Sequence, residues 1–325
     1  MMETRLSIII VSWNVQQELL DCLRSIGDHP PFGPYEVIVV DNASTDGTIE
    51  TVRREFASVR VVANTENRGF SAGNNAGIKE SKGEYVLLLN PDTVVHPGAL
   101  DTLTQFLEEN ADVAACGPRL LDGDGHNCCS VGAVPTFRGI LYRSTPFRWL
   151  GIFRGHYNRL SREGPGYDRV AHVEQLSGAA LLIRRSVLEQ IGLLDERFFM
   201  YYEDVDLCLR ITAAGWRIAF VPSATITHLG GRSAAQVSAR KRMLLYASLL
   251  TYLRKHRGRL STTLFNLAFK PGVILKELGH VFSGSVVFGV SLLLFDRRRQ
   301  LKAQAKVKDS AMFLGQYGLF FLLKA

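Results

Sequence analysis

The chain has few cysteines and no pairing pattern among them. Its 325 residues include five cysteines, and none stands in a Cys-x-x-Cys spacing. Neither a disulfide framework nor a zinc site is indicated. The first residues also lack the basic start and long apolar core of a secretion signal, which favours a reduced, cytoplasmic setting.

Two common phosphate-binding motifs are absent as well. No Gly-x-Gly-x-x-Gly follows the first apolar run, and Gly-x-x-x-x-Gly-Lys-Ser/Thr does not occur. Dinucleotide binding and P-loop chemistry therefore lose their usual support. The sequence also lacks the series of long apolar runs that marks a polytopic membrane protein.

Charge is distributed unevenly along the chain. The net charge of +7 suggests nucleic acid or an anionic membrane as a partner. However, residues 1–230 hold 21 Lys and Arg against 28 Asp and Glu, whereas residues 231–325 hold 17 against 3. A uniformly basic nucleic-acid binder is not expected to carry a large acidic module, which argues against nucleic acid as the partner. The asymmetry predicts two domains, 1–230 and 231–325, with different partners.

The first domain alternates short apolar runs with helical stretches, which is typical of βαβ units and a mainly parallel sheet. Strands are predicted over residues 6–13, 36–40, 59–63, 85–89, 113–117, 175–183, 217–221 and 224–228. Helices are predicted over residues 16–26, 48–56, 71–80, 99–109, 185–191 and 203–214. The loop at 132–169 is too long to be a simple connector.

Polar residues follow several of the predicted strands directly. In open α/β sheets, ligands bind beyond the carboxyl ends of the strands. Asp41 is placed to accept hydrogen bonds from a base edge or a sugar hydroxyl. Asp92 follows an apolar strand and a proline, and its carboxylate suits Mg²⁺ or Mn²⁺ bridging two phosphates. The alternative for both residues is an ordinary turn position.

Three carboxylates and a histidine are further candidates. Asp206 and Arg210 are four residues apart on a predicted helix, so they pair on its surface. Asp204 is left free to act as a base, ionised at neutral pH by its ordinary pKa, with Glu203 beside it to bind an acceptor hydroxyl. His228 precedes a glycine pair, a setting that favours a metal or phosphate contact over a structural role.

These elements together resemble the inverting family 2 glycosyltransferases with the nucleotide-binding GT-A fold, and they are most similar to the bacterial rhamnosyltransferase branch. The resemblance implies an α/β fold, a Rossmann-like mixed sheet flanked by helices, with a basic helical C-terminal extension. The motifs that carry it are residues 10–14, 39–48, 67–75, 90–92, 202–206 and 228–231.

The resemblance also implies residue roles. Asp204 is the catalytic base with Glu203 as its neighbour, and Mg²⁺ or Mn²⁺ is held by Asp92 and His228. Asn90 stands where many relatives have an acidic residue. The diphosphate or the acceptor meets Arg232 and Trp149. The nucleotide is lined by Ser12, Asn14, Asp41, Asn67, Arg68, Gly69, Asn74 and Asp92.

The implied activity is the transfer of one sugar, rhamnose from dTDP-rhamnose, to a saccharide or lipid-linked saccharide in cell-envelope polysaccharide synthesis. The processive synthases' Gln-x-x-Arg-Trp motif is absent, which favours single-sugar addition. Two alternatives stay open. One is a transferase of the same family that uses a UDP-hexose or UDP-N-acetylhexosamine. The other is a non-catalytic nucleotide-binding module whose basic tail binds lipid or nucleic acid.

The basic C-terminal domain contains two apolar stretches, residues 281–295 and 312–323. Both are shorter than the roughly 20 residues that a membrane-spanning helix needs. The basic residues between them predict interfacial helices on anionic lipid, and hence a peripheral enzyme on the inner face of the cell membrane. The alternative is a helical pair packed on the catalytic domain with solvated charges. Homo-oligomerisation is left open.

Overall fold

The computed structural model describes residues 4–128, 130–155, 167–230, 238–294, 296–318 and 321. The chain forms two compact units: unit 1 comprises Met1–Val134 and Gly164–Ser233, and unit 2 comprises Pro135–Glu163 and Ala234–Ala325. The sequence analysis placed residues 135–163 in the first domain. The structure groups them with the C-terminal helices, because aromatic side chains such as Phe137 pack there, stacked on Phe265.

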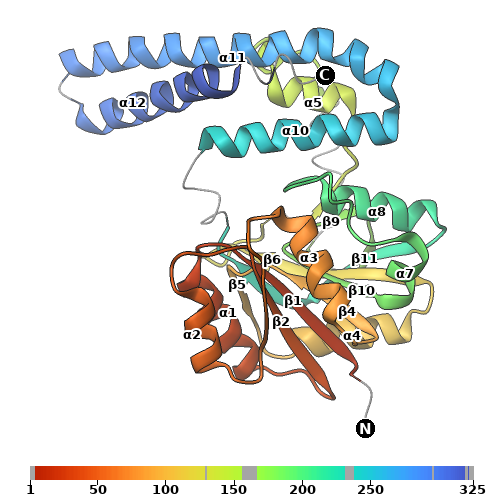
Figure 1. Cartoon of the computed structure of the whole chain (residues 1–325). Helices are drawn as coiled ribbons and strands as arrows, with labels where there is room; N and C mark the ends of the chain where they lie inside the picture. Colours follow the sequence, from red (N-terminus) through yellow and green to blue (C-terminus); the bar gives the residue numbers. More distant parts are fainter. Residues whose placement is uncertain are drawn as a thin grey trace. The chain divides into compact units, whose positions relative to one another are not determined.

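Unit 1 is built on a mixed β-sheet flanked by helices on both faces (Figure 1). The strands of the sheet are β1 (Leu6–Ser12), β2 (Tyr35–Asp41), β3 (Arg60–Ala63), β4 (Tyr85–Leu89), β5 (Thr93–Val95), β6 (Val113–Leu121), β8 (Ala171–His172), β10 (Ala180–Arg184) and β11 (Arg217–His228). Their order is β3-β2-β1-β4-β10-β6-β11-β5, with β8 paired to β11. The first four strands are parallel, whereas β10 is antiparallel to both of its neighbours. The mixed α/β architecture expected from the sequence is confirmed.

The helices of unit 1 connect these strands. They are α1 (Gln16–Asp28), α2 (Thr48–Glu55), α3 (Gly69–Glu80), α4 (Ala99–Glu109), α7 (Arg185–Ile191) and α8 (Glu203–Ala213). Two strand predictions were wrong in detail. Residues 175–183 form β9 (Gln175–Leu176), which pairs with β7 (Val131–Gly132), and the separate strand β10. The two strands expected at 217–228 are one, β11, with a register shift between Val221 and Thr225.

The core lies on both faces of the sheet. Ile8 and Ile10 of β1 pack with Leu19 of α1 on one face, and Ile9 packs with Ile78 of α3 on the other. Burying each of these side chains stabilises the unit by about 1.5–3 kcal/mol. Strands covered on both faces read as continuous apolar runs, which is why they could be recognised in the sequence.

Helix α3 packs close to the sheet at two of its three glycines, Gly73 and Gly77. A Cβ at Gly73 would lie 2.7 Å from Cγ1 of Val11, and one at Gly77 would lie 3.0 Å from Cγ2 of Val40. The close approach brings the first turn of α3 onto the carboxyl ends of β1 and β2.

Unit 2 is helical in the part that the structure describes. It consists of α5 (Phe137–Ser144), η1 (Pro146–Arg148), α10 (Ser238–Arg257), α11 (Arg259–Leu293), α12 (Arg297–Met312) and a π-helix, η2 (Phe313–Gly318). Gly258, with φ +82°, separates α10 from α11. Tyr246, Phe269 and Phe313 pack edge to face at its centre.

Helix α11 corrects one expectation. The apolar stretch that begins at residue 281 is not an isolated short segment, because it continues a 35-residue helix. By length and composition alone, this helix could cross a membrane. The full length of this helix was not foreseen from the apolar stretch alone.

Candidate active site

Buried polar atoms without partners mark the carboxyl ends of β1 and β2. Ser12 and Asp41 are direct partners in the register of these strands, and both are fully buried. One oxygen of Asp41, Oδ2, accepts a hydrogen bond from the backbone N–H of Ser44 at 2.8 Å. Neither Oδ1 of Asp41 nor Oγ of Ser12 has a hydrogen-bond partner among the described residues. Because an unsatisfied buried oxygen is costly, these atoms are placed to meet a ligand's donors.

The first turn of α3 supplies two more such atoms. Oγ of Ser71 and Oδ1 of Asn74 are buried and have no partner within the described part of the chain. The turn is fixed from both sides, since the Asn67 carboxamide oxygen accepts from the N–H of Gly69 at 3.0 Å and the Asn42 amide donates to the carbonyl of Gly69. Sequence reasoning missed Ser71, because a serine in a helix carries no signal of its own.

Gly69 can only be glycine. Its φ is +83°, and an added Cβ would overlap the carbonyl and the ring of Phe199. The N–H of Phe70 donates to that same carbonyl at 2.7 Å. The start of α3 is thereby attached to the loop that leads into α8.

Two residues predicted to line the nucleotide have other contacts. Oδ1 of Asn14 accepts from the N–H of Thr45 at 2.8 Å, so Asn14 holds the loop that follows β2. Arg68 is half-exposed, and its guanidinium lies 3.5 Å from a carboxylate oxygen of Glu196.

The predicted metal ligands do come together. Antiparallel pairing of β5 with β11 places His228 opposite Thr93, and Nε2 of His228 lies 3.3 Å from Oδ1 of Asp92. The Asn90 amide nitrogen is 3.2 Å from the same ring nitrogen. Asp92 is 4% exposed. One carboxylate and one imidazole that face each other are ligands that Mn²⁺ or Mg²⁺ accepts, with the remaining positions left for phosphate oxygens and water.

A second acidic cluster, Asp122, Asp124 and His126, lies in the turn after β6. Oδ1 of Asp122 accepts the backbone N–H groups of Asp124 and His126, at 3.0 and 2.9 Å. These hydrogen bonds lower the pKa of Asp122, and the bond from the N–H of His126 has the largest effect. The cluster is accounted for as a stable, exposed turn.

Asp204 lies close to the Asn90–Asp92 turn. Its Oδ2 accepts from the N–H of Gly178 at 3.2 Å, and its Oδ1 accepts from the N–H of Val205 at 2.8 Å. The carbonyl of Ala179, the residue after Gly178, accepts from the N–H of Asn90 at 2.9 Å. Sequence reasoning missed Gly178; the signal was a glycine inside an apparent strand, which often marks an interruption.

The electrostatics around Asp204 differ from the expectation. Burial raises the pKa of Asp204 above its ordinary value, so the prediction of an untuned aspartate was wrong. The pKa of Glu203 is raised well above its ordinary value, mainly by burial and secondly by the negative charge of Asp204. The backbone before this pair is strained, since Tyr201 and Tyr202 have φ of +71° and +68°.

Asp206 has the structural role predicted for it. It pairs with Arg210 at 2.9 Å, but the carboxylate is fully buried rather than on the surface. Arg210 also donates to the carbonyls of residues 191–193. Arg232 lies outside the described residues. Trp149 belongs to unit 2, not to the unit that carries the other candidates, and its ring centroid is 5.8 Å from that of His280.

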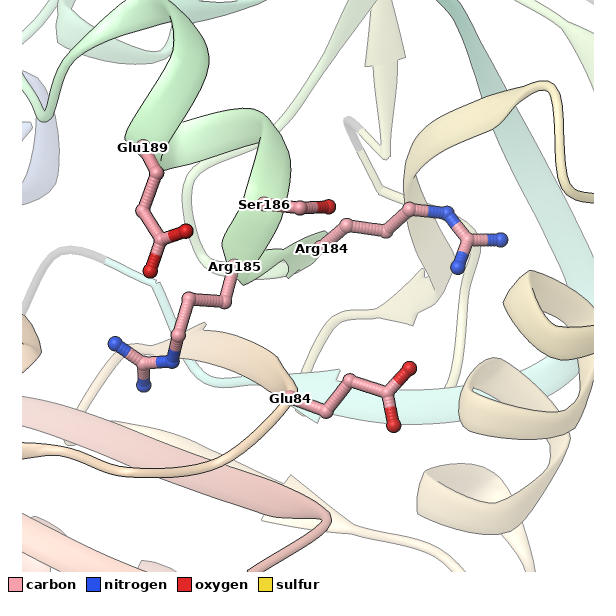
Figure 2. Close-up of a pocket in the computed structure, with 5 residues that line it drawn as sticks. All are labelled: Glu84, Arg184, Arg185, Ser186 and Glu189. Atoms are coloured by element: carbon pink, nitrogen blue, oxygen red, sulfur yellow. The ribbon is translucent and has the colours of Figure 1, made fainter.

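A cavity of about 270 Å³ lies at the other end of the strands, lined by Glu84, Arg184, Arg185, Ser186 and Glu189. Figure 2 shows the two arginines pointing to opposite sides. Arg184 donates to the carbonyls of Val113 and Asn110, and Arg185 donates to Gly83 and Ser81. These guanidinium groups hold backbone segments together and do not converge on a ligand.

Comparison with solved structures defines the fold. The mannosyltransferase PcManGT from Pyrobaculum calidifontis, solved with GDP-Man and Mn²⁺, superposes with a TM-score of 0.56 at 19% identity, over 97% of this chain and 88% of that chain. The chain therefore has the GT-A glycosyltransferase fold, as the sequence motifs implied.

Sequence comparison defines the family. The sequence model of "Glycosyltransferase like family 2" matches residues 4–244, so the chain belongs to this family. It is 34% identical to the N-acetylglucosaminyl-diphospho-decaprenol L-rhamnosyltransferase of Mycobacterium tuberculosis over 208 residues, 60% of this chain and 66% of that protein. It is 28% identical to the rhamnosyltransferase WbbL of Escherichia coli, over 68% of this chain and 82% of that one. The chain thus spans just under two thirds of the mycobacterial relative.

Proposed function

We propose that this protein is an inverting glycosyltransferase that transfers one sugar from a nucleotide-sugar to a saccharide or lipid-linked saccharide acceptor. The observation that carries the proposal is the link between Asp204 and the Asn90–Asp92 turn: Asp204 accepts from the N–H of Gly178, and the adjacent Ala179 accepts from the N–H of Asn90. A single inverting displacement needs a base beside the acceptor and charge neutralisation at the leaving diphosphate, and these are the two groups that this link joins.

The nucleotide is proposed to bind at the carboxyl ends of β1 and β2. Oδ1 of Asp41 accepts an N–H of the base or a sugar hydroxyl, and Oγ of Ser12 and of Ser71 offer further hydrogen bonds. Asn14 and Asn67 act indirectly by holding the flanking loops. Arg68 is the cation at this edge, and its partly exposed side chain is free to swing from Glu196 toward a phosphate.

Asp92 and His228 are proposed to hold Mg²⁺ or Mn²⁺. The donor set fits, because a carboxylate oxygen and an imidazole nitrogen already face each other at 3.3 Å. When bound, the cation would neutralise charge on the departing diphosphate. Asn90 contributes a neutral amide, so the protein supplies one carboxylate at this position.

Asp204 and Glu203 are proposed to divide the acid–base work. Both are desolvated, but Asp204 accepts two N–H bonds that stabilise its charge, whereas Oε2 of Glu203 has no partner among the described residues. We therefore propose that a proton held by these two carboxylates sits on Glu203. Asp204 remains ionised to take the proton of the acceptor hydroxyl, and protonated Glu203 can donate a hydrogen bond to the acceptor.

The donor is proposed to be dTDP-rhamnose, because two relatives are named as rhamnosyltransferases. The name of the mycobacterial relative, with its diphospho-decaprenol acceptor, supports a lipid-linked acceptor and a role in cell-envelope polysaccharide synthesis. An acceptor of this kind places the enzyme on the cytoplasmic face of the cell membrane.

A donor panel tests the proposal. Thermal unfolding is measured with dTDP, UDP and GDP, each with and without Mn²⁺, and then transfer is assayed from dTDP-rhamnose and from UDP-hexoses. We expect dTDP with Mn²⁺ to give the largest stabilisation. A larger shift and faster transfer with a UDP-sugar would replace rhamnose as the donor. A nucleotide-induced shift without transfer from any donor would support the non-catalytic nucleotide-binding module, and no shift with any nucleotide would refute the nucleotide site.

Matched variants locate the site. In Asp41→Asn, one oxygen can still accept from Ser44, so the fold is kept while the unpartnered acceptor becomes a donor. This variant should lose the nucleotide-induced shift. Asp92→Asn should keep the nucleotide-induced shift in thermal unfolding measured without Mn²⁺ and lose the additional shift that Mn²⁺ gives. Asp122→Asn, in the exposed turn, is the control and should behave like the parent.

A further inference from the structure

Helix α11 carries a continuous apolar stripe that nothing in the described part of unit 2 covers. Successive residues of a helix are rotated by about 100°, and on this basis the eight apolar side chains named below fall within an arc of about 100°. No charged residue of α11 lies on that arc. We call these eight side chains the α11 stripe. Each member is half exposed or more: Leu260, Leu264, Leu267, Leu275, Leu278, Phe282, Val286 and Leu293.

The opposite side of α11 attaches it to unit 2. Phe269, Val273, Gly284 and Ser291 are buried there, and Glu277 is 1% exposed with the Arg242 guanidinium at 3.4 Å. The helix is therefore fixed by one face and presents the other outward. A contiguous exposed apolar surface of this length marks an interaction site.

Charge identifies the partner as anionic. Unit 2 contains 22 Lys and Arg against 4 Asp and Glu. Exposed cations of α12, Arg297, Arg298, Arg299, Lys302, Lys306 and Lys308, accompany the C-terminal half of α11. A second copy of so basic a unit would be repelled, whereas an anionic lipid surface attracts it and also accepts the apolar side chains.

Helix α12 decides the orientation of α11 in such a surface. The two helices lie side by side (Figure 1), because Lys306 donates to Oγ of Ser283 at 3.1 Å and Gln300 donates to the carbonyl of Ser291 at 3.0 Å. A spanning α11 would draw the cations of α12 into hydrocarbon, at about 2.5–3.5 kcal/mol each. An α11 lying in the membrane plane keeps them at the headgroups.

Trp149 extends the same surface. An added Cβ at Gly279 of α11 would lie 2.7 Å from Cη2 of Trp149, so the indole packs directly on this helix. Trp149 is 56% exposed and the adjacent Leu150 is 70% exposed. Tryptophan is enriched at the lipid–water boundary, so this residue fits a membrane anchor better than the acceptor contact expected from the sequence.

We infer that α11 lies in the plane of an anionic membrane surface, with its stripe and Trp149 inserted among the lipids and the α12 cations at the headgroups. The inference rests on the proposed location at the cell membrane and deepens it. Its test requires neither donor nor acceptor, so failure of the catalytic proposal would not affect the result.

Flotation of the full-length protein with vesicles tests the surface. The vesicles contain phosphatidylcholine alone or with 30% phosphatidylglycerol. The variant Leu278→Ser/Phe282→Ser should bind anionic vesicles at least about tenfold more weakly, because two inserted side chains are lost. Phe32→Ser in unit 1 is the matched control, since Phe32 is 79% exposed and Phe282 is 74% exposed. The control should bind as the parent does.

Three outcomes would overturn the inference. In flotation, these are equal binding by the stripe variant and the parent, or equal binding of the parent to neutral and anionic vesicles. The third is a parent dimer, seen by light scattering without lipid, that the stripe variant abolishes while its vesicle binding is unchanged. The last would assign the stripe to a second copy.

Quenching by brominated lipids tests the orientation. Tryptophan is introduced at Leu264, Phe282 or Leu293 in a Trp149→Phe background, and the signal of that background, which still holds Trp13 and Trp216, is subtracted. An in-plane helix gives similar quenching at all three positions, stronger from bromines near the headgroup than from those near the chain ends. Deep quenching at Phe282 with little at Leu264 would show a spanning helix and refute the in-plane arrangement.

Discussion

Replacing Asp204 by asparagine should abolish transfer and leave the fold intact. The asparagine oxygen can still accept from the N–H of Gly178, whereas the bond from the N–H of Val205 is lost, at a cost of about 1 kcal/mol. What disappears is the capacity to take a proton, which for a positioned general base contributes about 10²–10⁴-fold in rate. This corresponds to roughly 3–5 kcal/mol of transition-state stabilisation.

Glu203→Gln, unlike Asp204→Asn, should keep most of the transfer activity if Glu203 holds the proton. Glutamine resembles the protonated acid, so turnover should stay within about fivefold of the parent. Stability should also separate the two forms. The raised pKa of Glu203 means that its contribution to stability is full below the unfolded pKa and is lost as pH rises through the folded one. The Gln variant should therefore gain stability relative to the parent as pH rises.

The assay measures release of the nucleoside diphosphate from the best donor across pH, with thermal unfolding of each variant recorded in parallel. The parent should lose kcat as pH falls through the raised pKa of Asp204. Asp206→Asn is the internal control: it breaks a buried ion pair and should lower Tm, yet keep kcat per folded molecule. Turnover of Asp204→Asn within a few-fold of the parent would refute the assignment of the base.

Three further predictions concern other parts of the molecule. His228→Ala should weaken the apparent Mn²⁺ affinity, measured by the Mn²⁺-dependent shift in Tm with nucleotide, by about tenfold or more; an unchanged affinity would exclude His228 as a ligand. Gly69→Ala should destabilise the protein by about 2 kcal/mol or more, because the residue has a left-handed backbone and its new Cβ would also overlap Phe199. Gly98→Ala should cost about 1 kcal/mol, because its φ is +70° but the space around it is open. Equal losses of unfolding free energy in denaturant would contradict this. Arg242→Met should destabilise by about 3–5 kcal/mol, because it removes the guanidinium that pairs with buried Glu277 and with Asp309, and a denaturant-measured loss under 1 kcal/mol would contradict it.

The fold of unit 1 could be predicted because its strands are buried on both faces and thus appear as uninterrupted apolar runs. The split into β9 and β10 was missed although Gly178 stands between them, because a glycine inside a strand pattern indicates an interruption but not which strand each part pairs with. Nor could the grouping of residues 135–163 with unit 2 be predicted, because it depends on tertiary pairs such as Phe137 with Phe265.

The candidate site shows the same division. Asp41, Asp92 and His228 stand at strand ends, so their types and positions in the sequence were enough to select them. The raised pKa of Asp204 follows from burial and from the partners of its oxygens, which no local pattern encodes. Ser71 and Gly178 matter through an unpartnered oxygen and a backbone N–H, and such features are visible only once the chain is folded.

The charge of the two units now has a physical interpretation. Unit 1 is acidic, with 16 Lys and Arg against 27 Asp and Glu, although its proposed donor is itself an anion. The proposed site would reduce this conflict in two ways: a cation at Asp92 and His228 would offset the diphosphate, and a proton retained on Glu203 would remove one negative charge beside Asp204. Unit 2 carries the opposite charge, which suits a surface of anionic lipid. If both proposals hold, added salt should release the protein from vesicles, because screening weakens exposed charges. It should change donor binding far less, because the buried, metal-dependent contacts are screened less.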